Sequence, residues 1–272
     1  MRWLDALPRR RGRWVAAGAT DPGRVRTRNE DAFGLVGDPP LWVVADGMGG
    51  HRAGARASRV AVDALIRFFR EATGLPVAER LAAAVGAAHE AVVADARADP
   101  ARAGMGCTLV AAAVAGERLH VCHAGDARCY VGRGSALEPV TRDHSAVAEL
   151  GLAEGEALRH PMRNVVTRAV GVSPEGGASY AAHRLRGADR VLLCTDGLWS
   201  LGTRDDLAGI LASAPDPAGA CRELIAFALA RGAPDNVTAL VAFRRGRGRP
   251  RVSTSPPVPG SACSRCGSRR SR

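Results

Sequence analysis

The chain has 272 residues and a mass of 28.3 kDa, which suits one large domain or two small ones with a sizeable core. Hydrophobic residues make up 46% and charged residues 24%, a globular balance that excludes wholesale disorder. No apolar run reaches the ~20 residues of a membrane span, and the N-terminus lacks the pattern of a signal peptide. Seven scattered cysteines disfavour a disulfide-stapled secreted fold, so a cytoplasmic location is expected.

The net charge of +11 is concentrated at the two ends of the chain. Residues 1–13 carry a net charge of +4 and residues 244–272 carry +9, which leaves −2 for residues 14–243. We therefore predict a basic N-terminal extension over 1–13, a mildly acidic folded domain over 14–243, and a disordered tail rich in Arg, Pro and Ser over 244–272. The chain contains no lysine, so its arginines indicate a compositional bias rather than a nucleic-acid site.

Short segments with regular punctuation fill the predicted domain. Val-rich runs that end in Gly or Asp predict strands, and apolar residues at helical spacing predict two long helices, over 52–73 and 78–98. Because strands and helices come in blocks rather than in alternation, an α+β fold is favoured over a doubly wound sheet. Strands are predicted at 14–19, 31–36, 41–45, 107–114, 118–123, 127–132, 191–195 and 236–243, with further helices at about 144–151, 204–213 and 217–231.

Acidic residues stand at the ends of these predicted strands, several of them next to glycine. A carboxylate at a buried strand end is unfavourable unless it is paired or bound to a metal. Hard divalent cations take such oxygen ligands, and a glycine lets a backbone carbonyl approach the ion. A single Asp-Gly would indicate a turn, but five such sites together predict a metal centre. The sites are Glu30-Asp31, Asp46-Gly47, Asp126, Asp196-Gly197 and Asp235-Asn236.

Eight short motifs follow one another between residues 23 and 237. They are Gly-Arg-Val-Arg-Thr-Arg-Asn-Glu-Asp (23–31), Val-Ala-Asp-Gly-Met-Gly-Gly-His (44–51), Gly-Met-Gly-Cys-Thr (104–108), His-Ala-Gly-Asp-Ala-Arg (123–128), Thr-Arg-Asp-His-Ser (141–145), Val-Thr-Arg-Ala-Val-Gly (166–171), Cys-Thr-Asp-Gly-Leu (194–198) and Pro-Asp-Asn-Val (234–237). With this ordered series the chain resembles the PPM-type, or type 2C, metal-dependent serine/threonine protein phosphatases of bacteria. Each motif is weak alone, but the series covers nearly all of the predicted domain.

The resemblance implies a central sandwich of two antiparallel β-sheets flanked by α-helices, with the metal ions at one end. It implies that Asp46 bridges two Mn²⁺ or Mg²⁺ ions and that the Gly47 carbonyl binds one of them. The further metal residues that it implies are Asp196 and Asp235 on the other ion, Glu30 and Asp31 near the pair, and Asp126 with Asp196 on a possible third ion.

The implied reaction is hydrolysis of phosphoserine and phosphothreonine on proteins by a metal-bridging water, with Arg26, Asp46 and Asp196 as the catalytic residues. Arg26 matches the phosphate-binding arginine of the family, and its planar fork suits two phosphate oxygens. Two metal ions supply both a nucleophile at neutral pH and charge neutralisation for this very slow reaction. No cysteine stands in a Cys-x5-Arg arrangement, which disfavours a thiolate phosphatase. A cognate Ser/Thr kinase and a monomeric state are expected.

One departure from the family pattern leaves the acid for the leaving group open. Several family members carry a His after the first Asp-Gly that is proposed as the general acid, but this chain has Met48 there. His51 is an alternative, although a solvent-facing His at a helix start fits this position better. Asn236, next to Asp235, is a further site candidate.

Three other functions compete with this interpretation. A partner-switching phosphatase acting on an anti-sigma-factor antagonist would have the same fold, but such proteins usually carry sensor domains and none fits here. A catalytically inactive regulatory module is disfavoured because every expected metal ligand is present. A nucleic-acid-binding protein led by the Arg-rich tail would bind without sequence specificity, and the tail has no aromatic residues for stacking.

Overall fold

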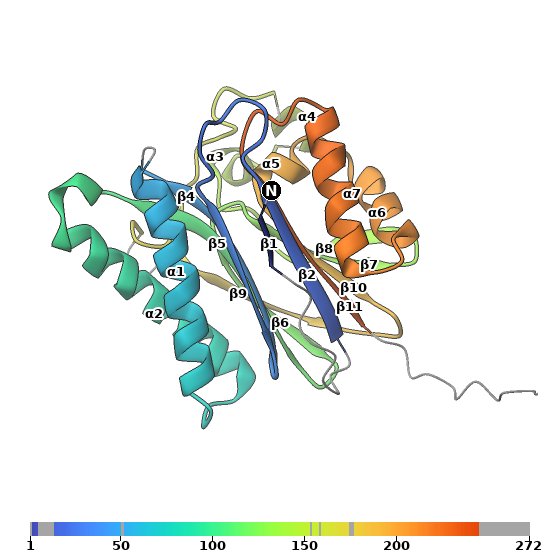
Figure 1. Cartoon of the computed structure of the whole chain (residues 1–272), viewed down its shortest axis with the longest axis horizontal. Coiled ribbons are helices and arrows are strands. Elements are labelled where there is room, and N and C mark those ends of the chain that lie inside the picture. The colour runs from blue at the N-terminus through green and yellow to red at the C-terminus, as the bar shows by residue number, and fades with distance from the viewer. Residues whose placement is uncertain are drawn as a thin grey trace, which may run out of the picture.

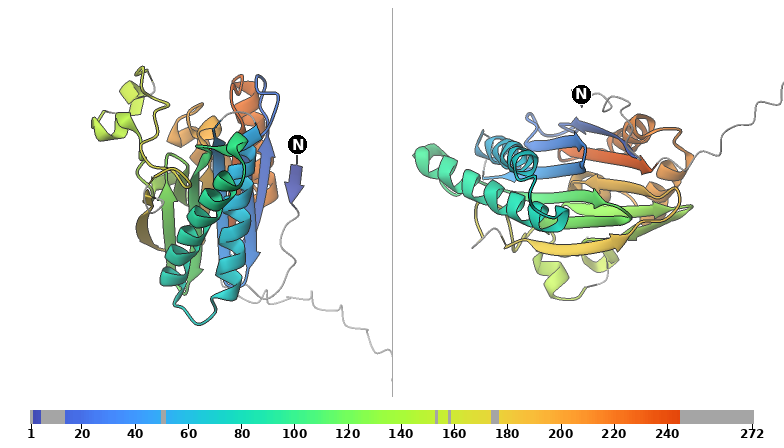
Figure 2. Two further views of the ribbon diagram at one scale, coloured as in Figure 1. Left: turned by 90° about the vertical axis from the view of Figure 1, so that its left-hand side faces the viewer. Right: turned by 90° about the horizontal axis from the view of Figure 1, so that it is seen from below.

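The computed structural model describes residues 2–4, 14–49, 52–152, 154–157, 159–173 and 177–244. Two antiparallel sheets pack face to face, and pairs of helices cover their outer faces, so that the molecule has four layers (Figure 1, Figure 2). This architecture confirms the predicted α+β sandwich. His51 and residues 245–272 of the predicted tail lie outside the described residues.

The first sheet has six strands in the order β1-β2-β11-β10-β7-β8. All of its pairings are antiparallel, and its central strands β11 and β10 are the late strands that the sequence analysis predicted. Its members are β1 (Arg2–Leu4), β2 (Trp14–Asp21), β7 (Arg128–Arg133), β8 (Ala136–Pro139), β10 (Arg190–Cys194) and β11 (Val237–Arg244).

The second sheet has five antiparallel strands in the order β3-β4-β5-β6-β9. Short hairpins join β3 to β4 and β5 to β6, a long helical connection separates β4 from its neighbour β5, and β9 joins β6 at the edge after another long connection. Its members are β3 (Asp31–Gly37), β4 (Pro40–Met48), β5 (Gly106–Ala115), β6 (Arg118–Ala124) and β9 (Ser179–Arg184).

Two helix pairs form the outer layers. The helices α1 (Arg52–Glu71) and α2 (Val77–Ala98) contact β3, β4, β5 and β6, whereas α6 (Arg204–Ser213) and α7 (Pro217–Ala230) contact the other sheet (Figure 1). Short helices lie in the connections: η1 (Pro100–Arg102), α3 (Ala146–Glu149), α4 (Glu154–Ala157) and α5 (Asp196–Trp199).

The central strands read as continuous apolar runs because both of their faces are buried. In β4, Val43 faces the helices whereas Val44 faces the opposite sheet. In β10, Leu192 and Leu193 alternate in the same way. Successive strand side chains point to opposite faces, so three separate apolar clusters form between the four layers. Trp42, only 1% exposed, lies in the cluster between the sheets.

Local side-chain contacts define where the helices of the second pair begin. Thr203 precedes α6 and accepts a hydrogen bond from the Asp206 N–H, while the Asp206 carboxylate accepts from the Thr203 N–H. The Asp216 carboxylate accepts from the Gly219 N–H at 2.7 Å, with Pro217 in the first turn of α7. These contacts satisfy N–H groups that have no partner within the helix.

The structure contains strands that the sequence analysis did not predict. Residues Ser179–Arg184 form β9, whose side chains alternate between half-buried and exposed. They include two alanines, a serine and an arginine, so the segment lacks the Val-rich signal, and it is held as an edge strand by pairing with β6. The unpredicted β1 pairs with β2, and β11 continues one residue beyond the predicted end, to the buried Arg244.

The interface between the sheets predicts opposite effects for two Gly→Ala substitutions. A Cβ at Gly18 of β2 would lie 2.3 Å from the Phe33 ring of the opposite sheet, whereas a Cβ at Gly86 of α2 would meet nothing within 4 Å. We expect Gly18→Ala to lower the free energy of unfolding by about 1–3 kcal/mol through overpacking. Gly86→Ala should raise it by about 0.5–1 kcal/mol because alanine favours the helix. Urea unfolding of both variants measures this, and equal shifts would contradict the packing described here.

Candidate active site

The strand register brings the predicted acidic residues to one end of the sandwich. Asp31, which opens β3, lies directly opposite Asp46 near the end of β4. In the other sheet, Asp196 follows β10 and Asp235 precedes β11, which is the antiparallel neighbour of β10. The chain therefore collects carboxylates from both sheets at the same edge.

A cavity of about 230 Å³ opens at this edge. It is lined by both predicted and unpredicted residues: Arg26, Arg28, Glu30, Asp46, Gly47, Met48, Thr108, Asp126, Asn164, Val166, Asp196, Asp235 and Asn236. Arg28, Thr108 and Val166 stand in the quoted motifs but were given no role there, and Asn164 was not singled out from the sequence. Asn164 lies in the long segment between β8 and β9, outside every quoted motif, and no local pattern distinguishes it.

Asp31 differs from the other acidic residues because it lies beneath the cavity rather than on its wall. Its carboxylate accepts hydrogen bonds from the Thr195 and Thr238 hydroxyls, at 3.0 and 2.5 Å. The Thr238 hydroxyl also lies 2.7 Å from the hydroxyl of Thr20. Asp31 is 8% exposed, and its Oδ1 atom has no hydrogen-bond partner. The structure thus places this predicted metal residue next to Asp46 in the sheet but not among the lining groups.

Asn236 fastens the loop that precedes β3. Its amide nitrogen donates to the carbonyls of Pro22 and Arg28, at 3.0 and 2.8 Å, and its side-chain oxygen accepts from the Glu30 N–H at 2.8 Å. Its own N–H donates to the Asp235 carboxylate at 2.8 Å. Pro22, Arg28 and Glu30 belong to the loop that precedes β3, so the Asn236 side chain holds this loop next to Asp235.

Gly47 is required by close packing as well as by its proposed place at the metal. A Cβ at this position would lie 2.1 Å from the carbonyl oxygen of Gly54 in α1 and 2.7 Å from that of Glu30. The Gly47 N–H donates to the Glu30 carbonyl at 3.2 Å. Ser58 donates to the same carbonyl at 2.5 Å, so the start of α1 is docked against the loop that carries Glu30.

Asp126 reaches the cavity from a three-residue connection between β6 and β7. Gly125 adopts φ +94°, a left-handed conformation that glycine tolerates, and packs directly on Thr108. Its N–H donates to His144 Nδ1 at 3.3 Å, and its carbonyl accepts from the His144 N–H at 3.0 Å. Asp126 itself is 7% exposed.

Arg26 stands at the rim of the cavity. Its guanidinium donates to the Asp235 carboxylate at 2.7 Å, and its side chain remains 58% exposed. Such an exposed pair contributes little to folding stability, so the guanidinium is available for another anion.

Burial and mutual repulsion raise the pKa values of four carboxyl groups around the cavity. Burial, reinforced by the charges of Asp31 and Asp196, holds the pKa of Asp46 well above its ordinary value. Burial and then the charge of Asp196 raise the pKa of Asp126 to about 7. Burial also raises the pKa of Asp31 to about 7, against the hydrogen bonds from its two threonines, and that of Asp196 to about 6. The site therefore resists full ionisation by itself.

These residues fit divalent cations. Asp196 Oδ1 is buried without a hydrogen-bond partner, and oxygen ligands of this kind suit Mn²⁺ or Mg²⁺. Among the described residues, no three His, Cys, Asp or Glu side chains are yet gathered tightly enough to hold an ion. Hard cations keep several water ligands, so water can complete the coordination that these side chains begin. Glu30, Asp46, Gly47, Asp126, Asp196 and Asp235 are the lining residues that could contribute.

Comparisons with known proteins converge on one family. The sequence profile described as Protein phosphatase 2C matches residues 23–227. The serine/threonine phosphatase stp of Listeria welshimeri is 34% identical over 236 residues, which cover 83% of this chain and 94% of that protein. The serine/threonine protein phosphatase PstP of Mycobacterium tuberculosis is 38% identical over 231 residues, covering 83% of this chain but 44% of that longer protein.

Solved structures agree with the sequence comparisons. The crystal structure of the Mycobacterium tuberculosis phosphatase PstP/Ppp superposes with a TM-score of 0.77 at 36% identity, covering 84% of this chain and 97% of that one. The catalytic domain of PstP in complex with two manganese ions gives a TM-score of 0.75 at 34% identity, with coverage of 84% and 97%.

The raised pKa values predict how a divalent cation stabilises the protein. In the metal-free protein, ionising these buried acids becomes a growing penalty as the pH rises from their ordinary pKa of 3.8 to about 7. A cation binds the ionised carboxylates, so the rise in Tm that Mg²⁺ produces should be small near pH 5 and large near pH 7.5. Thermal unfolding with Mg²⁺ or with a chelator measures the difference. An equal rise at both pH values would contradict the assignment of these carboxylates to a cation. Asp63→Asn is the control, because it removes an exposed carboxylate of α1 that does not line the cavity.

Proposed function

Because the chain belongs to the protein phosphatase 2C family, we propose that it hydrolyses phosphoserine and phosphothreonine on proteins in a metal-dependent reaction. The observation that carries this proposal is the cavity itself, where carboxylates from both sheets face an exposed arginine at the rim. This arrangement suits a substrate that is a dianion and a cofactor that is a cation. The relatives named as serine/threonine phosphatases support the substrate class.

Arg26 is the residue that we assign to the substrate phosphate. Its guanidinium is exposed beside Asp235, and a planar fork can bind two phosphate oxygens at once. The ion pair with Asp235 orients the guanidinium at the rim. Arg28, from the same loop, also lines the cavity and adds positive charge at its mouth.

The acidic wall is the part of the chain that we assign to the metal ions. Asp46 and the Gly47 carbonyl, with Asp196 and Asp235, would hold two Mn²⁺ or Mg²⁺ ions, and Asp126 with Asp196 a third. Bound there, the ions supply a water of lowered pKa and neutralise charge on the phosphoryl oxygens. The manganese ions in the PstP neighbour support this choice. Asp31 would act indirectly, next to Asp46, and Glu30 from the wall.

A thiolate mechanism receives no support from the described cysteines. Cys107, Cys122, Cys129, Cys194 and Cys221 are all buried. Burial raises the pKa of Cys122 to about 12 and that of Cys221 to about 12, so these thiols stay protonated at neutral pH. None of the five lines the cavity.

The cellular setting is a separate proposal. No helix in the described ranges has both the length and the apolarity to cross a membrane. We propose that the protein acts in the cytoplasm as a monomer and opposes a cognate Ser/Thr kinase, as a phosphatase of phosphoproteins requires a kinase to supply its substrate.

Asp46 provides the sharpest test of the acidic wall. Asp46→Asn keeps the size of the side chain but removes its charge, so kcat should fall by at least about 100-fold with an aryl phosphate and Mn²⁺. The same test should be made with a phosphothreonine peptide, because that substrate also tests the proposed class. Asp63→Asn, the same change on exposed α1, should leave kcat unchanged. Full activity of Asp46→Asn, or wild-type turnover that survives a chelator, would overturn the mechanism.

Arg26 should affect binding more than turnover. Arg26→Ala removes a charged contact to phosphate that exists in both the ground state and the transition state, so KM should rise by at least about tenfold while kcat changes little. Arg24→Ala, an exposed arginine two residues earlier that does not line the cavity, is the matched control. Steady-state kinetics on the aryl phosphate separates the two parameters. A fall in kcat at unchanged KM would show that Arg26 acts in the transition state alone.

A further inference from the structure

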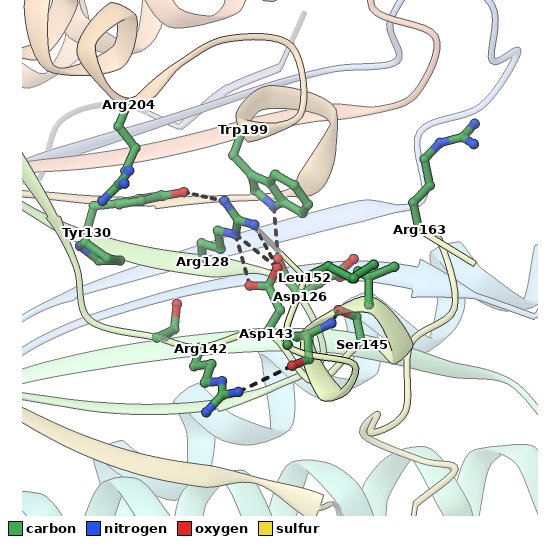
Figure 3. Close-up of a pocket in the computed structure, with 15 residues that line it drawn as sticks. Asp126, Arg128, Tyr130, Arg142, Asp143, Ser145, Leu152, Arg163, Trp199 and Arg204 are labelled. Carbon is green, nitrogen blue, oxygen red and sulfur yellow. Dashed lines mark hydrogen bonds and ion pairs between the residues drawn. The ribbon is translucent and has the colours of Figure 1, made fainter. Parts of the chain in front are cut away.

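Trp199 links two catalytic segments through its indole ring. It is the last residue of α5, the short helix that Asp196 opens, and it is partly buried. Its Nε1–H donates to the main-chain carbonyl of Asp126 at 2.9 Å. The Arg128 guanidinium lies over the ring (Figure 3), and its carbon Cζ is 3.5 Å from the ring centroid. The Trp199 side chain therefore joins the helix that begins at Asp196 to the loop that contains Asp126.

The Arg128 guanidinium is itself held in place. Its Nε and Nη2 atoms donate to the Asp143 carboxylate at 2.9 and 2.8 Å, and its Nη1 atom donates to the Tyr130 hydroxyl at 3.0 Å (Figure 3). Both members of the ion pair are largely buried, with side-chain exposures of 14% and 13%. The planar guanidinium is thus a fixed platform on which the Trp199 ring stacks.

The Asp126 loop needs such a contact. It consists of three residues, Gly125 to Ala127, between β6 and β7, and Gly125 lies in a left-handed conformation. His144 holds the loop at Gly125, whereas Trp199 holds it at Asp126 itself. Asp126 and Asp196 line the same cavity, where the charge of Asp196 disfavours ionisation of Asp126. Without a cation, like charges push the two carboxylates apart.

We propose that Trp199 is a positioning residue that holds Asp126 beside Asp196, so that the two carboxylates can share a divalent cation. Trp199 touches neither the cation nor the substrate in this role. Its N–H fixes the main chain of Asp126, and its stacking on Arg128 fixes the direction of that N–H. The inference rests on the proposed function only in taking the cation for a cofactor.

The first experiment measures Mn²⁺ binding directly on the metal-free full-length protein. Trp199→Phe keeps an aromatic ring over Arg128 but removes the donor, so one class of Mn²⁺ site should bind about 3- to 10-fold more weakly, as the loss of one hydrogen bond predicts. Trp199→Tyr is a second variant that also lacks the indole N–H. Trp14→Phe makes the same change at a tryptophan that stacks edge-on against Trp42 in the other sheet, and it should not alter Mn²⁺ binding.

The second experiment tests whether Trp199 acts through Asp126. Asp126→Asn should weaken the same class of Mn²⁺ site, and Trp199→Phe added to it should cause no further loss. Unchanged Mn²⁺ affinity in both Trp199 variants would overturn the proposal. So would an equal loss in the Asp126→Asn background, because a general packing defect would act independently of Asp126. Metal-free Tm values of all variants show how much of any effect is loss of folding.

Failure of this inference can be told apart from failure of the proposed function. Titration calorimetry with Mn²⁺ alone reports on the site without any substrate. Weaker Mn²⁺ binding by Trp199→Phe in a protein without phosphatase activity would support the inference and reject the function. An active, Mn²⁺-dependent wild type whose Trp199 variants bind Mn²⁺ normally would support the function and reject the inference.

Discussion

Electrostatic repulsion among the carboxylates buried at one end of the sandwich is the main physical constraint on this structure. Four of these acids have raised pKa values, and burial is the first cause in each case. A core built for stability alone would exclude them, because an unpaired buried charge is expensive. Placing them where strands from both sheets end allows one cavity to collect them. A cation with oxygen ligands removes the repulsion and is the partner that this end of the fold is built to accept.

The rest of the fold keeps this unfavourable cluster in place. Three apolar clusters fasten the four layers together, so that the strand ends are held by packing far from the cavity. Around the cavity itself, polar contacts take over. Two threonine hydroxyls donate to Asp31, Asn236 joins the Arg28–Glu30 loop to Asp235, and Trp199 joins α5 to the Asp126 loop. Each contact fixes a carboxylate or its main chain, and preorganised ligands of this kind favour binding of a cation.

The strands that were predicted correctly are mainly those buried on both faces, whereas exposed edge strands were missed. Elements buried on both faces, such as β4 and β10, were predicted because their apolar runs are unbroken. The edge strand β9 was missed because its residues, Ser-Tyr-Ala-Ala-His-Arg, lack an apolar run, and it is held as a strand by pairing with β6. The short α5 was missed for a related reason, because four residues are too few to show a helical period. In the structure, α5 packs against β11, and its Trp199 donates to the Asp126 carbonyl.

By itself, the sequence predicted the buried strands and the two helix pairs, and it led us to propose the acidic residues for a cation, whereas the arginine for a phosphate came from the family resemblance. Strand periodicity and an Asp next to a Gly are local signals, and a single chain displays them directly. The tertiary structure alone decided which of these residues share a cavity. It placed Asp31 beneath the cavity and used the Asn236 side chain to hold the loop before β3. It also brought Asn164 and Trp199 close to the acidic residues. These outcomes depend on contacts between residues far apart in the chain, such as Thr195 and Asp31, which no local pattern encodes.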